Sequence, residues 1–413
     1  MKGYKSMKKN RAKNKKAKKI LGIIALIFVL FVCATVAATV IGNNANIKKA
    51  NTFETVQIEN QLVPQKDENG NWTFTTDKEF KVMQLTDIHI GGGWMSLSKD
   101  AKALNAVAAM VTAEKPDLVV VTGDIAYPVP FQAGTFNNLS GAKIFAELME
   151  KLGVYWTVTL GNHDSEIYSY YGREKISNFY AESGFTYCLY QPGPDDVDGY
   201  GNHVINVKNS AGKITQSIYM LDSQAYTKDD PFGFRWLYDN VHENQVEWYK
   251  KTVKQIGDEN GAPVNSLMFM HIPLTELNDA WFEYADNGYQ NTENVELVYG
   301  VAGEKDKVVY CGVGEDNLFE TILELDSTKA VFFGHDHKNN FAAKYKGIQL
   351  SYSYSVDYLA YIGISKEGEQ RGCTIINVKP DGSFVSHLEN YYQDKYVTLY
   401  EKEEVTMQEV TYN

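Results

Sequence analysis

Residues Phe80 to His89 read FKVMQLTDIH, and this stretch sets a pattern that recurs along the chain. Its first six residues form a short apolar run, which predicts a buried β-strand. Asp87 and His89, whose side chains can bind metal ions, follow directly. Four further motifs of this kind each follow an apolar run: Gly123-Asp124, Gly161-Asn162-His163-Asp164, His271 and Gly334-His335-Asp336-His337. Polar residues that follow successive strands in this way indicate a binding site at one edge of a sheet.

Two predicted helices separate the first three of the predicted strands. Ser98 to Glu114 and Ala142 to Leu152 carry alanine and leucine at helical spacing, and they stop before Lys115-Pro116 and Gly153. The alternation predicts β-α-β units with parallel strands. After Gly334 the pattern continues with strands and no clear helix, which predicts a second sheet packed on the first. The predicted strands are Phe80–Leu85, Leu118–Val121, Tyr155–Leu160, Ile218–Leu221, Leu267–Met270, Val331–Phe333, Gly347–Tyr354, Thr374–Val378 and Ser383–His387.

The ligand types of the five motifs predict a site for two metal ions. Carboxylate, amide-oxygen and imidazole ligands without a thiolate suit iron, manganese or zinc, so the identity of the metal stays open. Two such ions lower the pKa of a bridging water and neutralise the charge of a phosphate ester. The motifs therefore favour phosphate-ester hydrolysis, and they require one carboxylate that both ions share.

The five motifs resemble those of the calcineurin-like metallophosphoesterase superfamily over roughly residues 80–340, and their spelling is most similar to the purple-acid-phosphatase-like branch. The resemblance implies an α/β fold, a two-sheet β-sandwich flanked by helices in four layers (α/β/β/α). It also implies a ligand set: Asp87, His89 and His337 for the first metal, Asp124 as the bridge, and Asn162, His271 and His335 for the second metal.

The same resemblance assigns catalytic roles to two residues next to the ligands, His163 and Asp164. His163 would donate a proton to the leaving group or stabilise the charge of the transition state, and Asp164 would orient its ring. Purple members of the family use the tyrosine of a Gly-Asp-x-x-Tyr motif as a ferric ligand, and Tyr127 stands at that place. His89 is present as well, in the form that colourless members use. We expect His89 to bind metal and Tyr127 to pack or support it.

The leading hypothesis is hydrolysis by a metal-activated hydroxide at a dinuclear centre, with phosphomonoesters as the favoured substrates. A phosphodiesterase, a nucleotidase or a pyrophosphatase on the same centre is an alternative, as is a non-catalytic binding protein of the cell envelope. The substrate would be a phosphorylated small molecule or a nucleotide. Gly201-Asn202-His203 imitates the third motif but follows no predicted strand, so we expect His203 to be structural or on the surface.

Charge is distributed unevenly along the chain. The 413 residues have 44% hydrophobic content, enough for one large catalytic domain. Residues 1–19 carry ten Lys or Arg and no acidic residue, so the net charge of -12 leaves -22 for the remainder. An acidic body argues against stable nucleic-acid binding. The sequence does not predict the oligomeric state.

The N-terminal segment predicts export. Ile20 to Ile41 carries no charge and is long enough to span a bilayer, and the Lys-rich residues before it favour a cytoplasmic N-terminus. We expect a single-pass protein of the cell membrane with its catalytic domain outside. Val36-Ala37-Ala38 offers a signal cleavage site, so a secreted protein is the alternative. The length of the apolar segment favours the anchor.

These observations predict a division of the chain into five parts. They are a basic cytoplasmic tail (1–19), a transmembrane anchor or uncleaved signal (20–42), a linker with a leading hairpin (43–77), the catalytic domain (78–395), and a C-terminal tail or edge strand (396–413).

Overall fold

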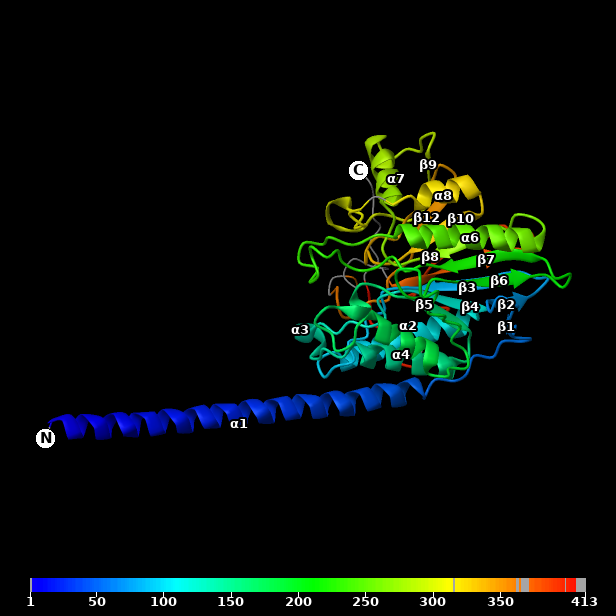
Figure 1. Cartoon of the computed structure of the whole chain (residues 1–413). Coiled ribbons are helices and arrows are strands. Elements are labelled where there is room, and N and C mark those ends of the chain that lie inside the picture. Colours follow the sequence, from blue (N-terminus) through cyan, green and yellow to red (C-terminus); the bar gives the residue numbers. More distant parts are fainter. Residues whose placement is uncertain (1, 315, 362–363, 365–370, 398, 406–413) are drawn as a thin grey trace.

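The strands of the computed structural model, which describes residues 2–314, 316–361, 364, 371–397 and 399–405, form two sheets (Figure 1). The larger has nine strands in the order β1 (Gln65–Lys66), β2 (Trp72–Thr75), β6 (His203–Lys208), β7 (Ile214–Met220), β8 (Ser266–Phe269), β10 (Thr328–Phe333), β12 (Ile348–Tyr352), β11 (Ala342–Tyr345) and β9 (Val295–Tyr299). The smaller has five in the order β14 (Phe384–Asn390), β13 (Gly372–Val378), β3 (Phe80–Leu85), β4 (Leu118–Thr122) and β5 (Trp156–Thr159).

Helices cover the outer faces of both sheets. Their bounds are α1 (Lys2–Ala50), α2 (Leu97–Glu114), α3 (Pro130–Ala133), α4 (Asn138–Leu152), α5 (Arg173–Glu182), α6 (Glu243–Asn260), α7 (Thr275–Asp286) and α8 (Leu318–Leu325), with 3₁₀ turns η1 (His163–Ser165) and η2 (Lys305–Lys307). In Figure 1, α2 and α4 lie below the smaller sheet, and α6 and α8 lie above the larger one. The predicted helices at 98–114 and 142–152 are observed as α2 and α4.

Alternation of side chains along the central strands explains how the layers pack. In β8, Leu267 and Phe269 point into the core between the sheets, whereas Met268 packs in the core formed with α6, α7 and α8. In β4, Val120 faces the other sheet and Val121 packs with α2 and α4. Such strands are buried on both faces, which is why they read as continuous apolar runs. The expected four-layer fold, a two-sheet α/β sandwich flanked by helices, is confirmed.

We expected the strands after Gly334 to build the second sheet, but they are divided between the two sheets. β11 and β12 extend the larger sheet beside β10, and β13 pairs with β3 in the smaller sheet. An apolar run predicts that a strand is buried, but it carries no information about the neighbour with which the strand pairs.

The N-terminal helix α1 contains a segment, within Asn14–Ala50, that is long and apolar enough to cross a membrane, and its apolar side chains are exposed. The helix continues past residue 42 and packs against α2 and α4. Asn46 Nδ2 donates to Asp100 at 3.5 Å, and Ala50 is fully buried. Residues 43–50 of the predicted linker are therefore docked helix, and the predicted hairpin follows as β1 and β2.

The C-terminal boundary at residue 396 stays a prediction. Within 396–413, residues 398 and 406–413 lie outside the described residues, and the described stretch 399–405 contains no strand.

Gln84 joins the two sheets beneath the predicted site and offers a test of this packing. Its Nε2 donates to Thr122 Oγ1 and to the Phe333 carbonyl, both at 2.9 Å, and the side chain is fully buried. Gln84→Met keeps a similar volume but removes both hydrogen bonds, so we expect the free energy of unfolding to fall by about 1–3 kcal/mol. The midpoint of urea unfolding measures the change. Gln255→Met, at an exposed position of α6, is the control, and an equal shift in both variants would contradict the assigned role.

Candidate metal centre

The candidate ligands lie where the carboxyl ends of β3, β4, β5, β8 and β10 come together. Each follows its strand by a few residues, and parallel strands end at one edge of a sheet. Six of the seven form two groups that share Asp124: Asp87, His89, Asp124 and His337 in the first, and Asp124, His271 and His335 in the second. Within each group the ligand atoms all lie within 4.8 Å of one another.

The backbone at this edge adopts a left-handed conformation that residues other than glycine rarely adopt. The φ angles of Asp87, His89, Asp124 and His335 are 50°, 51°, 53° and 80°. Each such residue costs of order 1–3 kcal/mol and persists only where the surrounding structure fixes it. Here hydrogen bonds do so: the N–H of His335 donates to Asp87 Oδ2 at 3.1 Å, and that of His89 donates to the Asp124 carbonyl at 3.0 Å.

Two motif glycines are explained by the close approach of neighbouring loops. A Cβ on Gly161 would lie 2.1 Å from Asp124 Oδ1, and a Cβ on Gly334 would lie 1.9 Å from Thr86 Oγ1. Any larger residue would push the strand ends apart, so both motifs need glycine for packing.

In the first group, a single carboxylate, that of Asp357, lies behind both histidines. It is fully buried, 3.3 Å from His89 Nδ1 and 3.5 Å from His337 Nδ1. These contacts are close enough for electrostatic attraction, although they are not aligned as hydrogen bonds. The Nε2 atoms then face the other way, 3.3 Å from Asp124 Oδ2 and 3.7 Å from Asp87 Oδ1. Asp357 therefore holds the two rings with the same nitrogen toward the centre.

In the second group, the proton of His271 has a defined place. Its Nδ1 lies 2.7 Å from the Thr122 carbonyl, so Nδ1 carries a hydrogen and Nε2 is the nitrogen that faces the centre. Nε2 lies 3.1 Å from Asn162 Oδ1, 3.3 Å from Asp124 Oδ2 and 3.3 Å from His335 Nδ1. Asn162, which lies outside the two groups above, is thereby brought to the second one.

This donor set fits metal ions on physical grounds. Buried lone pairs of oxygen and nitrogen that face one another are unfavourable unless a proton or a metal ion lies between them. Neutral imidazole, carboxylate and amide oxygen are ligands for first-row metal ions. Asp124 is within reach of both groups, as a shared ligand must be.

Burial and neighbouring charges compete in setting the protonation of the carboxylates. Burial would raise the pKa of Asp124, but the adjacent His271 and His163 hold it well below its usual value. Burial would likewise raise the pKa of Asp357, but His89 and His337 hold it below its usual range. Both groups are ionised at neutral pH. Burial raises the pKa of Asp87 to about 6.

His163 lies at the rim of the site, where its backbone N–H donates to Asp124 Oδ1 at 2.8 Å. Its Nδ1 is 2.6 Å from Glu166 Oε1. The expectation that Asp164 orients this ring is wrong, because the Asp164 carboxylate accepts three backbone N–H groups of the surrounding loops instead. The reason is the turn η1, since side chains three residues apart are aligned in a 3₁₀ turn.

Tyr127 packs beside His89 and His163, with ring centroids 4.9 Å and 4.8 Å away in edge-on contacts. Its hydroxyl donates to Gln132 Oε1 at 2.9 Å, and burial raises its pKa, so the phenol keeps its proton. This arrangement supports the expectation that His89, and not Tyr127, faces the metal.

The motifs did not reveal Asp357 or Glu166 as functional residues. Asp357 follows the carboxyl end of β12 by five residues, so the rule that located the other motifs could have found it. Glu166 lies three residues after His163 in the same motif. The sequence also gave no sign of Tyr226, whose hydroxyl accepts from Asn162 Nδ2 at 2.8 Å and thereby turns Oδ1 toward His271.

A cavity of about 320 Å³ adjoins the centre, with room for a phosphate ester. Its lining residues are His163, His335, His337, Asp336, Glu304, Lys305, Trp236, Tyr238, Tyr310 and Tyr361. Aromatic rings and one lysine therefore surround the candidate ligands.

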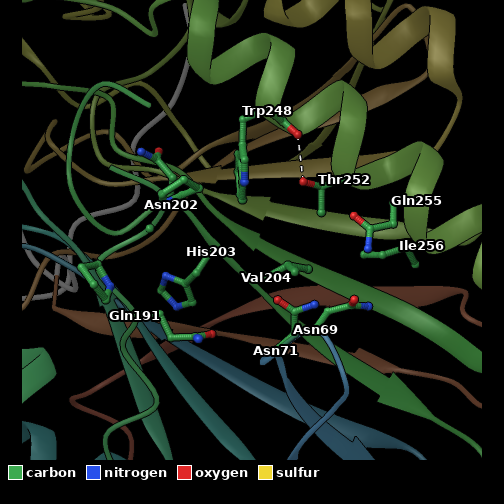
Figure 2. A pocket seen from close by; sticks show the side chains of 13 residues that line it. Asn69, Asn71, Gln191, Asn202, His203, Val204, Trp248, Thr252, Gln255 and Ile256 are labelled. Atoms are coloured by element: carbon green, nitrogen blue, oxygen red, sulfur yellow. Dashed lines mark hydrogen bonds between the residues drawn. The ribbon is translucent and has the colours of Figure 1, made fainter. Parts of the chain in front are cut away.

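Another cavity, of about 400 Å³, lies apart from the metal centre (Figure 2). Figure 2 shows amide side chains around it, together with Trp248 and His203. The ring of His203 is buried, with Nε2 2.9 Å from Thr157 Oγ1 and Nδ1 2.8 Å from the Gly201 carbonyl. Both nitrogens are engaged in holding the fold, which confirms that His203 is structural.

Comparisons with known proteins bear on the family of this chain. The family model described as calcineurin-like phosphoesterase matches residues 80–339. "Probable inactive purple acid phosphatase 14" of Arabidopsis thaliana is 30% identical over 316 residues, which cover 70% of this chain and 73% of that protein. "Phosphatase DCR2" of Saccharomyces cerevisiae is 26% identical, with 65% of this chain and 46% of that protein covered.

Among solved structures, a dimetal phosphatase from Danio rerio is similar, with 13% identity and a TM-score of 0.44 over 75% of this chain and 99% of that chain. The family match extends from the strand that precedes Asp87 to the residues just after His337, so it contains all the candidate ligands. On this basis, the chain belongs to the calcineurin-like phosphoesterase family.

Proposed function

We propose that the protein hydrolyses phosphate esters at a centre of two metal ions. The observation that carries this proposal is the pair of ligand groups that share Asp124. The proposed ligands are Asp87, His89 and His337 for one ion, Asn162, His271 and His335 for the other, and Asp124 for both. When bound, the ions would neutralise the charge of the ester and lower the pKa of a water molecule. Iron, manganese and zinc all suit these ligands.

His163 is the proposed proton donor or charge stabiliser. It lines the cavity next to the ligands, and Glu166 engages its Nδ1, which leaves Nε2 free to act on the substrate. A leaving alkoxide is a poor leaving group until it is protonated, so a donor at this place lowers the barrier. Asp164 contributes indirectly, since it fixes the backbone of the loop that carries Asp124.

A phosphomonoester is the substrate class we favour, because the names of the relatives describe phosphatases. The same names include the word inactive, which makes a non-catalytic binding protein the second candidate. Against it stands the presence of the complete ligand set together with the His163–Glu166 pair. A binding protein has no need of a proton donor held by a carboxylate.

We further propose that α1 anchors the protein in a membrane with the domain on the outer side. Its support is the uncharged segment Ile20–Ile41 and the ten basic residues that precede it. Cleavage near Val36-Ala37-Ala38 would instead release a secreted enzyme.

Asp124→Asn should abolish turnover and reduce the metal content, because the shared ligand loses its charge. Elemental analysis of the full chain gives metal ions per chain, and nitrophenyl phosphate and bis-nitrophenyl phosphate separate monoester from diester hydrolysis. Asp198→Asn, which changes an exposed carboxylate, is the control and should leave both readouts unchanged. Full turnover in Asp124→Asn would rule out the mechanism. Two metal ions without turnover of either ester in the unaltered chain would favour the binding protein.

His163→Asn should keep the metal content and lower turnover by about 10²–10⁴-fold, the usual contribution of a positioned acid. Glu166→Gln should show a smaller loss, because it removes the charge but keeps a hydrogen-bonding partner. If His163 donates a proton, both losses should be larger with an alkyl phosphate than with nitrophenyl phosphate, whose leaving group needs no proton. Equal losses with the two substrates would instead indicate stabilisation of charge on the phosphoryl group.

Asp357→Asn should weaken metal binding by about 10–100-fold, as substitutions behind a ligating histidine do. Calorimetric titration of the metal-free full chain with metal ions measures the affinity without reference to activity. Asp117→Asn is the matched control, because both carboxylates accept backbone N–H groups. Asp357 accepts those of Leu359, Ala360 and Tyr361, and Asp117 accepts that of Lys81 at 2.8 Å at the opposite end of the sheet. Equal metal affinity in the two variants would remove Asp357 from the site.

A further inference from the structure

Exposed apolar side chains gather on the loops around α3, beside the candidate metal centre. They are Trp94, Met95, Phe131, Phe136, Ile167 and Tyr170, with exposed fractions between 38% and 88%. We name these six residues the apolar rim. Soluble surfaces seldom expose such groups together, and a cluster of them marks a surface for a partner or a membrane.

Contacts show that the rim is one surface. The N–H of Met95 donates to the carbonyl of the last residue of α3 at 3.1 Å. A Cβ on Gly134, directly after α3, would lie 2.6 Å from Trp94 Nε1. The rings of Phe136 and Tyr170 stack with centroids 6.2 Å apart. The loops before α2, around α3 and after η1 therefore present their apolar side chains side by side.

The rim is fixed to the predicted membrane helix. Gly42 of α1 packs against Leu97, since a Cβ there would lie 2.3 Å from its Cδ2. Asn46, one turn further along α1, contacts Asp100, and Asp100 accepts the N–H of Gly91 at 2.9 Å. Gly91 opens the loop that carries Trp94. The orientation of α1 is thus coupled to the position of the rim.

This coupling sets the height of the rim above a membrane. The apolar segment of α1 ends at Ile41, next to Gly42, the residue that touches Leu97. Figure 1 shows α1 leaving the domain on the side on which α3 lies. When residues 20–41 span a bilayer, the rim lies level with the outer surface of that bilayer. Tryptophan and tyrosine are favoured at this depth, where one part of the ring is in lipid and the other in water.

The apolar rim also lies close to the candidate metal centre. Phe131 precedes Gln132, which accepts the hydroxyl of Tyr127, and the Tyr127 ring lies 4.8 Å from the ring of His163. Two side chains therefore separate the rim from the candidate proton donor.

We propose that the apolar rim inserts into the bilayer surface and that the metal centre acts on phosphate esters embedded in that bilayer, that is, on phosphorylated lipids. This inference rests on the proposed function and on the proposed anchor. In the reaction, water adds to phosphorus, the bond between phosphorus and the lipid oxygen breaks, and a proton passes to that oxygen. The products are inorganic phosphate and a lipid alcohol. The acidic body gives no attraction to an anionic surface, so apolar contact must hold the rim in place.

Fluorescence tests the insertion independently of catalysis. The full chain is reconstituted in phosphatidylcholine nanodiscs with and without brominated acyl chains, and bromine quenches tryptophans that reach the lipid. Trp94→Phe should remove part of the quenching, and this loss should persist at high salt because it does not depend on charge. Trp72→Phe is the control, because Figure 1 places β2 on the side of the domain away from α3. Equal quenching of the unaltered chain and Trp94→Phe would overturn the insertion.

Turnover tests the substrate class. The readout is the ratio of two rates in nanodiscs, that for phosphatidic acid in the bilayer and that for nitrophenyl phosphate in solution. Phe131→Ser should lower this ratio by about three- to tenfold, since an exposed phenyl group no longer enters the lipid. Phe282→Ser, at a position of α7 that is 49% exposed, should leave the ratio unchanged.

The outcomes separate the two proposals. An unchanged ratio in Phe131→Ser, with nitrophenyl phosphate still hydrolysed, would overturn the lipid assignment and leave the proposed function standing. Absence of turnover with both esters would overturn the proposed function and the lipid assignment, while the fluorescence result would still decide whether the rim inserts.

Discussion

The structure depends on the burial of carboxylates and imidazoles together at the seam between two sheets. Each such group is costly to bury unless it has a partner of opposite charge or a hydrogen bond. Asp124 lies at the middle of the cluster, where His271, His89 and the backbone of His163 all lie against its two oxygens. The left-handed backbone and the motif glycines at this edge are the means by which loops from different strands reach that one side chain.

Four of the five histidines of the site have a polar group next to the nitrogen that faces away from the centre. The Thr122 carbonyl holds His271, Glu166 holds His163, and Asp357 lies behind both His89 and His337. Fixing one nitrogen of an imidazole determines which nitrogen offers its lone pair and in which direction. The orientation of these imidazoles is therefore set by groups outside the proposed ligand set.

The part of this arrangement that could be predicted from sequence was the part governed by local rules. Apolar runs located the central strands, and the rule that ligands follow strand ends brought Asp87, Asp124 and His335 to one place. Partners set by the tertiary structure could not be predicted. Glu166 contacts the ring of His163 in place of the expected Asp164 because of one 3₁₀ turn, which no periodicity in the sequence indicates. The docking of residues 43–50 of α1 depends on Asp100, a residue some fifty positions later in the chain.

The pairing of β3 with β13 has a consequence for the order in which the domain assembles. β3 is the first strand of the smaller sheet and begins at Phe80, but the neighbour that covers its edge, β13, begins only at Gly372. An uncovered strand edge can pair with foreign chains, and contacts between distant segments form late. If the domain crosses a membrane starting from the end nearest the anchor, the smaller sheet has an open edge until nearly all of the domain has been translocated. Synthesis and export would then pass through a stage at which the chain depends on its cellular environment for protection against aggregation.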